Sequence, residues 1–332
     1  AYASQETAGV TEKISLAQAL EAEGHDRWTS FVMPYVGDWR RSMELQARVA
    51  QLQELLAAKK TIDAMEARGS TANGIEDWAR QVAPAIPMVD SPDVRIQRYF
   101  SRVTNSWRQF YIYTPPGYDV NATEKYPVLY ILHGGGEDER GWYTQGKTDL
   151  IIDNLVAEGK AKPMLVVMMD GNLSSGGAGG FGEQVLRMFE NELKNAVIPF
   201  VEKNYRAQTD AKSRALAGLS MGGLQTLYAG VKNTNLFSYL GVFSSGWFAN
   251  QPDLSNPQYD FMKTNASTIN NNLKSFWIAM GGKEDIAYNN CKIMMGKFDE
   301  MGIKYSYTEY PGGHTWPVWR NNLYNFAQVL FK

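Results

Sequence analysis

The feature that most constrains the fold is an alternation, after residue 94, between short apolar runs and longer helix-like stretches. Helices are expected at 147–159, 183–203, 221–232, 288–301 and 316–331. Runs rich in β-branched, aromatic and other apolar residues lie at 110–113, 128–132, 164–169, 215–218, 239–243, 276–280 and 305–308. Several runs are apolar throughout, as in strands covered on both faces. The alternation predicts an α/β fold with a mostly parallel central sheet flanked by helices.

The first 93 residues have a different composition. Residues 39–68 are rich in Ala, Leu, Gln, Glu and Lys, which favour helix, and a second short helix is expected at 75–82. Three prolines between 84 and 92 indicate an extended linker. We therefore predict a helical N-terminal extension and linker over 1–93, followed by an α/β domain over 94–332. The extension could serve as a cap, as an arm packed on the second domain, or as a surface for self-association.

Charge, hydropathy and cysteine content exclude several classes of function. The net charge is −2, from 33 Lys and Arg against 35 Asp and Glu, so there is no basic excess to bind nucleic acid or an anionic membrane. No apolar run reaches the ~18 residues of a membrane span. The single cysteine, Cys291, excludes an internal disulfide and a four-cysteine metal site. The small-x-small triplet Ala1-Tyr2-Ala3 fits a signal-peptide remnant and predicts a secreted or periplasmic protein.

A glycine-rich turn at 218–223, Gly-Leu-Ser-Met-Gly-Gly, lies between an expected strand and an expected helix. This context is the one that a G-x-S-x-G nucleophile elbow requires. Side chains at Gly218 and Gly222 would collide with the neighbouring strand and helix. The pattern predicts Ser220 as a nucleophile and the backbone N–H of Met221 as an oxyanion donor. The alternative is a glycine-rich turn with an incidental serine.

A serine nucleophile needs a base, and the chain has only three histidines. In this architecture the order along the chain is Ser, acid, His, and His314 is the only histidine after Ser220. We expect Asp285, in a turn just past a strand, to orient His314, with Glu284 as the alternative. The remaining carboxylates in the interval are expected in a polar loop (Asp253, Asp260), on a helix face (Asp299, Glu300) and in or at the end of a strand (Glu309).

The sequence His133-Gly134-Gly135-Gly136 follows an apolar run and matches the H-G-G-G type of oxyanion loop. We assign the second oxyanion donor to the backbone N–H of Gly135 and expect His133 to orient the loop through hydrogen bonds. A phosphate cradle is the rival interpretation, but the chain lacks the accompanying P-loop or dinucleotide-binding patterns.

Four further residues are predicted to contact substrate. Trp142 and Trp316 fall in or near strand-end loops, where flat aromatic walls would suit an aryl acid or a sugar face. Core packing is the alternative for either tryptophan. Gly134 and Asn172 lie just past strand ends on the side of the sheet expected to hold Ser220. We predict no metal ion and no organic cofactor.

Taken together, several segments resemble the esterase-D-like hydrolases. They are TPPGY (114–118), YPVLY (126–130), LHGGGED (132–138) and GLSMGG (218–223). The segment PGGHTW (311–316) with Trp319-Arg320 is similar to the carbohydrate-esterase branch that includes feruloyl and acetylxylan esterases. The resemblance covers roughly residues 95–332 and implies the α/β-hydrolase fold. It also implies a triad of Ser220, Asp285 and His314, with the loop at Gly134-Gly135 and Met221 as the oxyanion hole.

The resemblance further implies a serine esterase that releases ferulate from plant cell-wall xylan through an acyl-enzyme. Its substrate would be feruloylated or acetylated arabinoxylan, or oligosaccharides derived from it. An acetylxylan esterase, an acyltransferase or a thioesterase of the same fold are the alternatives, and a non-catalytic binding protein on this scaffold is a different class. Relatives often carry a β-sandwich carbohydrate-binding module upstream, whereas residues 1–93 here indicate helix.

Overall fold

The computed structural model describes residues 94–119, 123–173, 182–247 and 257–332. Contacts divide the chain into two units, Ala1–Pro92 and Asp93–Lys332, and every described residue belongs to the second. The predicted N-terminal helices, the triplet at 1–3 and Asp253 lie outside the described residues. The boundary at residue 93 and the role of the extension therefore stay predictions.

The centre of the described unit is an eight-stranded sheet of order β1-β2-β4-β3-β5-β6-β7-β8. β1 and β2 pair antiparallel, β2 pairs antiparallel with β4, and all later pairs are parallel. The predicted α/β fold with a mostly parallel sheet is thus confirmed. The strands are β1 (Val94–Ser101), β2 (Ser106–Tyr113), β3 (Val128–Leu132), β4 (Leu165–Met169), β5 (Arg214–Leu219), β6 (Tyr239–Phe243), β7 (Ser275–Met280) and β8 (Ser306–Glu309).

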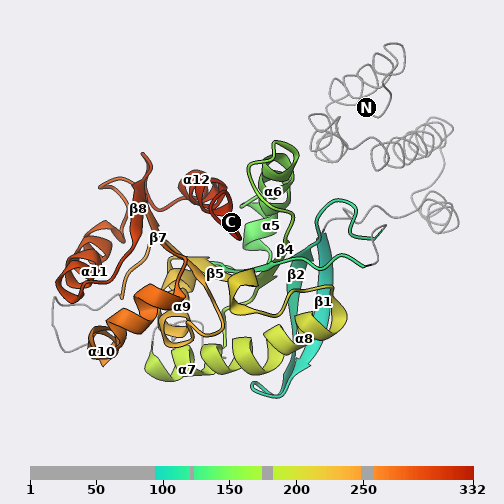
Figure 1. Cartoon of the computed structure of the whole chain (residues 1–332), viewed down its shortest axis with the longest axis horizontal. Coiled ribbons are helices and arrows are strands. Elements are labelled where there is room, and N and C mark those ends of the chain that lie inside the picture. The colour runs from blue at the N-terminus through green and yellow to red at the C-terminus, as the bar shows by residue number, and fades with distance from the viewer. Residues whose placement is uncertain (1–93, 120–122, 174–181, 248–256) are drawn as a thin grey trace, which may run out of the picture. The chain divides into compact units, whose positions relative to one another are not determined.

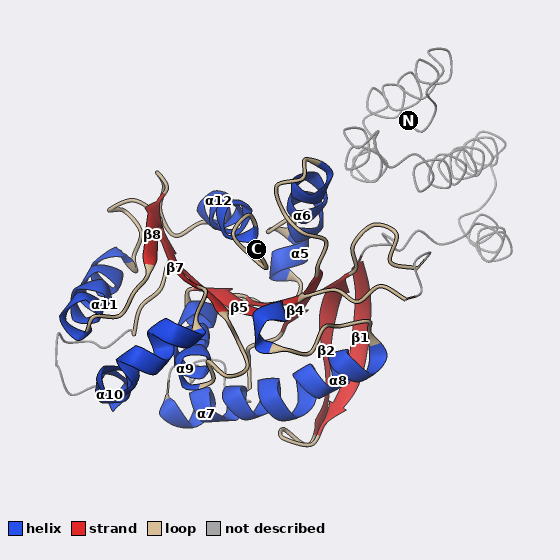
Figure 2. Cartoon of the chain, in the orientation of Figure 1, coloured by secondary structure: helices blue, strands red, loops and turns tan. Residues whose placement is uncertain are grey.

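Helices cover both faces of this sheet (Figures 1 and 2). One apolar cluster joins the sheet to α6 and α12, and a second joins the opposite face to α7 through α11. A π-helical turn, η1 (Leu193–Val197), connects α7 to α8, and a 3₁₀ turn, η2 (Ala211–Ser213), precedes β5. The helices are α5 (Gly141–Thr144), α6 (Thr148–Ala157), α7 (Glu183–Glu192), α8 (Ile198–Asn204), α9 (Met221–Lys232), α10 (Pro257–Asn272), α11 (Tyr288–Met301) and α12 (Trp316–Ala327).

Four elements differ from the sequence-based expectation. β1 was not predicted, and β2 begins four residues before the apolar run at 110–113, because its first residues, at 106–109, are exposed or half-buried. α10 occupies the region around Asp260 where a polar loop was expected. Its Asn- and Thr-rich sequence has weak helix propensity, so the sequence did not predict a helix, but Met262 and Ile269 bury against the core. The short helix α5 was also missed.

The topology places two glycine-rich loops side by side. From β3 the chain passes to β4 on one side and then to β5 on the other, which is the switch point where open α/β sheets bind ligands. The last residue of β3, Leu132, pairs with Gly218 of β5. The loops that begin at His133 and at Ser220 therefore leave neighbouring parallel strands at the same edge. Within the described ranges, no helix is long and apolar enough to cross a membrane.

Candidate active site

Ser220 occupies a strained turn between β5 and α9. Its backbone has φ 51° and ψ −114°, a conformation that costs a non-glycine residue about 1–3 kcal/mol. A Cβ at Gly218 would lie 2.4 Å from the carbonyl of Gly222, and one at Gly222 would lie 2.6 Å from the carbonyl oxygen of His133. The predicted need for glycine at both positions is confirmed. The Ser220 N–H donates to the carbonyl of Phe243 at 2.9 Å, so the elbow is fixed to β6.

His314 and Asp285 form a hydrogen-bonded pair. The Nδ1 of His314 lies 2.8 Å from the Oδ1 of Asp285, which also accepts the N–H of Ala287 at 2.9 Å. The Asp285 side chain is fully buried, whereas that of His314 is 16% exposed. The carboxylate that hydrogen-bonds His314 is thus Asp285 and not the neighbouring Glu284.

The surroundings of Asp285 favour its charged form. Burial alone would raise the pKa of this carboxyl, but hydrogen bonding from His314 and the Ala287 N–H lowers the pKa below its ordinary value of 3.8. The ring of His314 packs edge-on against Trp319, with centroids 5.0 Å apart. The imidazole is therefore held at Nδ1 and along one edge, and nothing in the described part of the chain hydrogen-bonds its Nε2.

Backbone hydrogen bonds join the strand-end loops that carry these residues. The Gly282 N–H donates to the carbonyl of Gly312 at 2.7 Å, so the loop after β7 is attached to the loop after β8. The Ser244 N–H donates to Ala279 at 2.8 Å, and the Ser245 hydroxyl donates to the carbonyl of Ser220 at 2.7 Å. The segments that hold Ser220, Asp285 and His314 are consequently connected at one edge of the sheet.

His133 holds the H-G-G-G loop from both ring nitrogens. Its Nε2 accepts the N–H of Gly171 at 3.0 Å and lies 3.2 Å from the Oδ1 of Asp170. Because Nε2 is the acceptor, the proton of the neutral ring sits on Nδ1, which donates to the carbonyl of Gly134 at 2.7 Å. The prediction that His133 orients this loop through hydrogen bonds is confirmed.

Glu137 is a site residue to which the sequence analysis gave no role. Its Oε2 accepts the N–H of Gly134 at 3.2 Å, and its Oε1 accepts the indole N–H of Trp316 at 2.8 Å. The N–H of Gly134 is thus already used, while Gly135 beside it is exposed. Met221 begins α9, where backbone N–H groups lack partners within the helix. The position of Glu137 directly after the three glycines was the available signal.

Asn172, predicted to contact substrate, supports the same loop. Its side-chain amide donates to the carbonyl of Glu137 at 2.7 Å, and its backbone N–H donates to the Oδ1 of Asp170 at 2.8 Å. Gly134 is buried directly behind the elbow, and a Cβ there would lie 3.5 Å from the Cβ of Ser220. Gly134 thus adjoins the elbow and Asn172 adjoins the H-G-G-G loop, while their contact with substrate stays a prediction.

The prediction that Trp142 forms a wall of the cleft is wrong. The side chain is 1% exposed, and its indole N–H donates to the carbonyl of Leu132 at 2.8 Å. Trp316 is 9% exposed and packs perpendicular to Trp142 at 5.2 Å, so most of its ring is also withdrawn from the surface. Core packing beneath the loops, the alternative considered above, explains Trp142. Among the described residues, no group of three or more His, Cys, Asp or Glu could hold a metal ion.

An elbow serine and a hydrogen-bonded histidine–aspartate pair, carried by loops at the carboxyl edge of a mostly parallel sheet, are typical of the α/β-hydrolase class. The chain matches the family model named Esterase over residues 101–328, and it therefore belongs to the esterase family of α/β-hydrolases.

Similar proteins include curated enzymes of bacteria. An endo-1,4-beta-xylanase/feruloyl esterase of Xylanibacter ruminicola is 33% identical over 240 residues, which is 70% of this chain and 31% of the relative. Endo-1,4-beta-xylanase Y of Acetivibrio thermocellus is 30% identical over 202 residues, which is 56% of this chain and 17% of the relative. The chain thus spans less than a third of the length of these two relatives.

Solved structures agree with this grouping. A ferulic acid esterase of Anaeromyces mucronatus, in complex with ferulic acid, superposes with a TM-score of 0.63 at 27% identity, over 72% of this chain and 90% of that one. The feruloyl esterase module of Clostridium thermocellum, complexed with sinapinate, superposes with a TM-score of 0.59 at 27% identity, over 72% of this chain and 88% of that one.

Proposed function

We propose that this protein is a serine carboxylic ester hydrolase with Ser220 as nucleophile, His314 as general base and Asp285 as orienting acid. The observation that carries the proposal is the 2.8 Å bond between Asp285 and Nδ1 of His314, at the sheet edge that also presents Ser220 on a strained elbow. Serine is a weak nucleophile until an adjacent base accepts its proton.

The reaction proceeds through an acyl-enzyme. Ser220 Oγ attacks the ester carbonyl while Nε2 of His314 takes the hydroxyl proton. The tetrahedral oxyanion accepts hydrogen bonds from the N–H groups of Gly135 and Met221. Collapse expels the alcohol, which receives the proton from His314, and water then attacks the acyl group with His314 again as base. Asp285 keeps the proton of the neutral ring on Nδ1 and stabilises the imidazolium.

The preferred substrate in this proposal is a ferulate ester on xylan. Support comes from the relatives and solved structures, whose names include feruloyl esterase and whose complexes hold ferulic acid or sinapinate. A polymeric xylan substrate would require the enzyme to act outside the cytoplasm, in agreement with the predicted secretion. No metal ion or organic cofactor takes part in this mechanism.

The test combines a labelling experiment with a product assay. Wild-type protein should react with a fluorophosphonate at Ser220 and release ferulate faster than acetate from feruloylated and acetylated xylan assayed side by side. Ser220→Ala should abolish both labelling and release, while Ser267→Ala, an exposed serine on α10, serves as the matched control. Activity of Ser220→Ala close to wild type would refute the serine mechanism, and faster acetate release would identify an acetylxylan esterase instead.

A further inference from the structure

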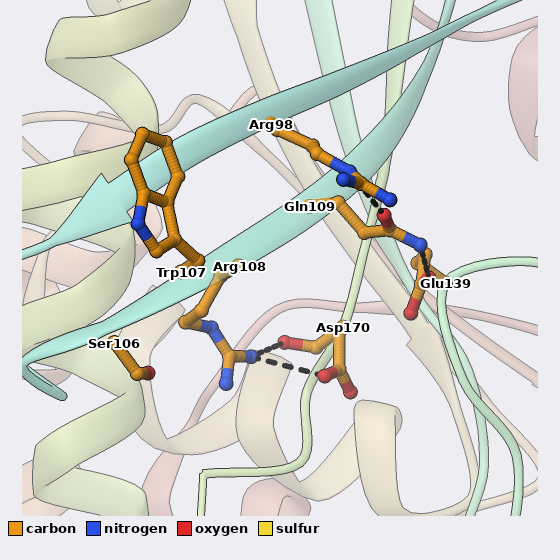
Figure 3. Close-up of a pocket in the computed structure, with 7 residues that line it drawn as sticks. All are labelled: Arg98, Ser106, Trp107, Arg108, Gln109, Glu139 and Asp170. Carbon is orange, nitrogen blue, oxygen red and sulfur yellow. Dashed lines mark hydrogen bonds and ion pairs between the residues drawn. The ribbon is translucent and has the colours of Figure 1, made fainter.

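A pocket of about 650 Å³ lies on the hairpin formed by β1 and β2, and its lining includes none of the proposed triad residues (Figure 3). Its walls include Arg98 of β1, Trp107 and Gln109 of β2, and Glu139 of the loop after β3. Ser106, Arg108 and Asp170 complete it. None of these residues has a role in the proposed ester hydrolysis.

The pocket adjoins the same sheet edge as Ser220. β2 pairs antiparallel with β4, with Phe110 opposite Met169, so the residues from Gln109 back to Trp107 extend past the carboxyl end of β4. Asp170 lies in the pocket and is also 3.2 Å from Nε2 of His133. Three strand spacings separate β2 from β5, or about 14 Å. Only an extended substrate, and not a free aryl ester, would reach from the elbow to this pocket.

One side of the pocket is an exposed aromatic surface. Trp107 is 73% exposed and packs edge-on against Phe100, which is 47% exposed, with ring centroids 5.7 Å apart. Phe100 and Trp107 are directly paired in the β1–β2 register, so both rings stand on one face of the hairpin. An exposed indole with a second ring beside it offers the flat apolar surface on which the C–H face of a sugar packs.

Planar polar groups held in fixed directions lie next to the aromatic surface. Gln109 Nε2 donates to Glu139 Oε1 at 2.6 Å, and Arg98 Nε donates to Gln109 Oε1 at 3.4 Å, as the row of side chains in Figure 3 shows. Arg108 donates to the carbonyls of Asp170 and Asn172 and forms an ion pair with Asp170 at 3.3 Å. The pocket thus presents donors and acceptors whose orientation is already set, as recognition of hydroxyl groups requires.

The charges of the pocket favour a neutral ligand. Its two arginines, Arg98 and Arg108, are balanced by the carboxylates of Glu139 and Asp170. An anionic ligand such as a phosphate would meet both carboxylates as well as the arginines. A neutral molecule rich in hydroxyl groups would meet no uncompensated charge.

We propose that this pocket is a sugar subsite that binds a neutral oligosaccharide segment of the polysaccharide while its ester group lies at Ser220. The proposal rests on the proposed esterase function and adds the part of the substrate that the enzyme holds outside the acyl group. Trp107 is the stacking residue, and Arg98, Gln109 and Glu139 bind hydroxyls. Arg108 is a positioning residue that bonds Asp170, and Asp170 in turn contacts His133, so this wall of the pocket is connected to the loop of His133.

The first test compares substrates with and without a sugar chain. In Trp107→Ala, the kcat/KM for a feruloylated arabinoxylo-oligosaccharide, divided by that for methyl ferulate, should fall about tenfold, mainly through KM. Ile96→Ala is the matched control, since Ile96 is 58% exposed on the same face of β1 but does not line the pocket. This control should leave the ratio unchanged. An unchanged ratio in Trp107→Ala, or equal losses on both substrates, would overturn the sugar subsite.

The second test does not depend on esterase activity. Xylohexaose, which carries no ester, is titrated into the full-length wild-type protein and Trp107→Ala, with isothermal calorimetry and tryptophan fluorescence as readouts. Binding that is lost in Trp107→Ala supports the subsite, even if fluorophosphonate labelling shows the proposed serine mechanism to be wrong. Absence of xylohexaose binding to the wild type, or equal binding to both proteins, overturns the subsite while leaving the esterase proposal intact.

Discussion

Two histidine–carboxylate pairs lie at the carboxyl edge of the sheet, and they differ in how many nitrogens of the histidine ring are hydrogen-bonded. His133, in the loop after β3, lies 3.2 Å from Asp170, which follows β4. His314, in the loop after β8, lies 2.8 Å from Asp285, which follows β7. The His133 side chain is 1% exposed and engages hydrogen-bond partners at both ring nitrogens. The His314 side chain is 16% exposed, and in the part of the chain described its ring is hydrogen-bonded at Nδ1 alone.

The comparison shows that a neighbouring carboxylate does not by itself make a histidine a base. A general base needs a nitrogen with a free lone pair within reach of the proton that it removes. Both nitrogens of His133 are used to fix the backbone of a loop, whereas Nε2 of His314 remains available. The structure thus separates a positioning histidine from a candidate base, and substitutions in each pair test that separation.

The largest effect is expected for His314→Ala. Removing the base should lower kcat on methyl ferulate by about 10⁶-fold, since triad members act as a unit. The free energy of unfolding should also fall by about 1–3 kcal/mol, because the fully buried Asp285 carboxylate loses the hydrogen bond from His314. Steady-state kinetics and urea unfolding measure the two quantities. A loss of less than tenfold in kcat would contradict the assignment of His314 as base.

Asp285→Asn should be the next most severe change. The amide can donate to Nδ1 and so place the ring proton on Nε2, the wrong nitrogen for a base, with a loss of about 10⁴-fold in kcat. Glu284→Gln is the matched control, because Glu284 is the adjacent carboxylate and does not bond His314. If Glu284→Gln were the more damaging of the two, the acid would be misassigned.

The same variant has a predictable effect on acid stability. A carboxyl whose pKa is lowered in the folded state stabilises the fold at pH values above 3.8, the ordinary pKa of the group. This stabilisation is lost as the pH falls through the lowered pKa. Asp285→Asn should therefore lose less unfolding free energy than the wild type when the pH is lowered below about 4. Urea unfolding at a series of pH values measures this difference, and parallel pH profiles for the two proteins would contradict it.

Long apolar runs and glycine patterns predicted their part of the fold correctly. The runs at 128–132 and 239–243 coincide with β3 and β6, and the expected helix at 221–232 coincides with α9. Such segments are buried throughout, so their composition follows from their environment. β1 was not predicted as a strand because its apolar residues alternate with arginine and glutamine. Such a segment has a polar average composition, and only its period of two indicates a strand.

The candidate site was predictable where chain order and backbone geometry select the residue. The elbow at Ser220 and the order Ser, acid, His require no knowledge of packing. The positions of Trp142 and Glu137 could not be derived in this way. Whether a tryptophan in a strand-end loop lines a cleft or fills the core depends on how α5 and α12 pack together. The hydrogen bond from Trp316 to Glu137 joins residues 179 positions apart in the sequence.

His133→Ala should lower kcat by about 10²-fold, which is far less than the loss expected for His314→Ala. The variant removes the acceptor of the Gly171 N–H and the donor to Gly134, so the oxyanion loop loses its fixed position. Leaving these buried groups unpaired should also cost about 2–4 kcal/mol of unfolding free energy. His133→Asn should restore part of both, because an amide can donate and accept. A loss of kcat as large as that of His314→Ala, with unchanged stability, would make His133 the base and reverse the comparison.

Glu137→Gln should have the smallest effect, and it tests how the two histidine regions are joined. Glu137 accepts one hydrogen bond from Gly134, next to His133, and another from Trp316, two residues after His314. A glutamine retains one acceptor oxygen, so one of the two bonds is lost and the stability should fall by about 1 kcal/mol. The kcat should fall about tenfold with little change in KM for methyl ferulate, since the loop shifts relative to the oxyanion but the acyl group still binds. Glu124→Gln is the matched control, because Glu124 is an exposed carboxylate that precedes β3 and lies in neither loop. If Glu137→Gln lowered stability without changing kcat, the link between the two regions would support the fold alone and not the position of the oxyanion hole.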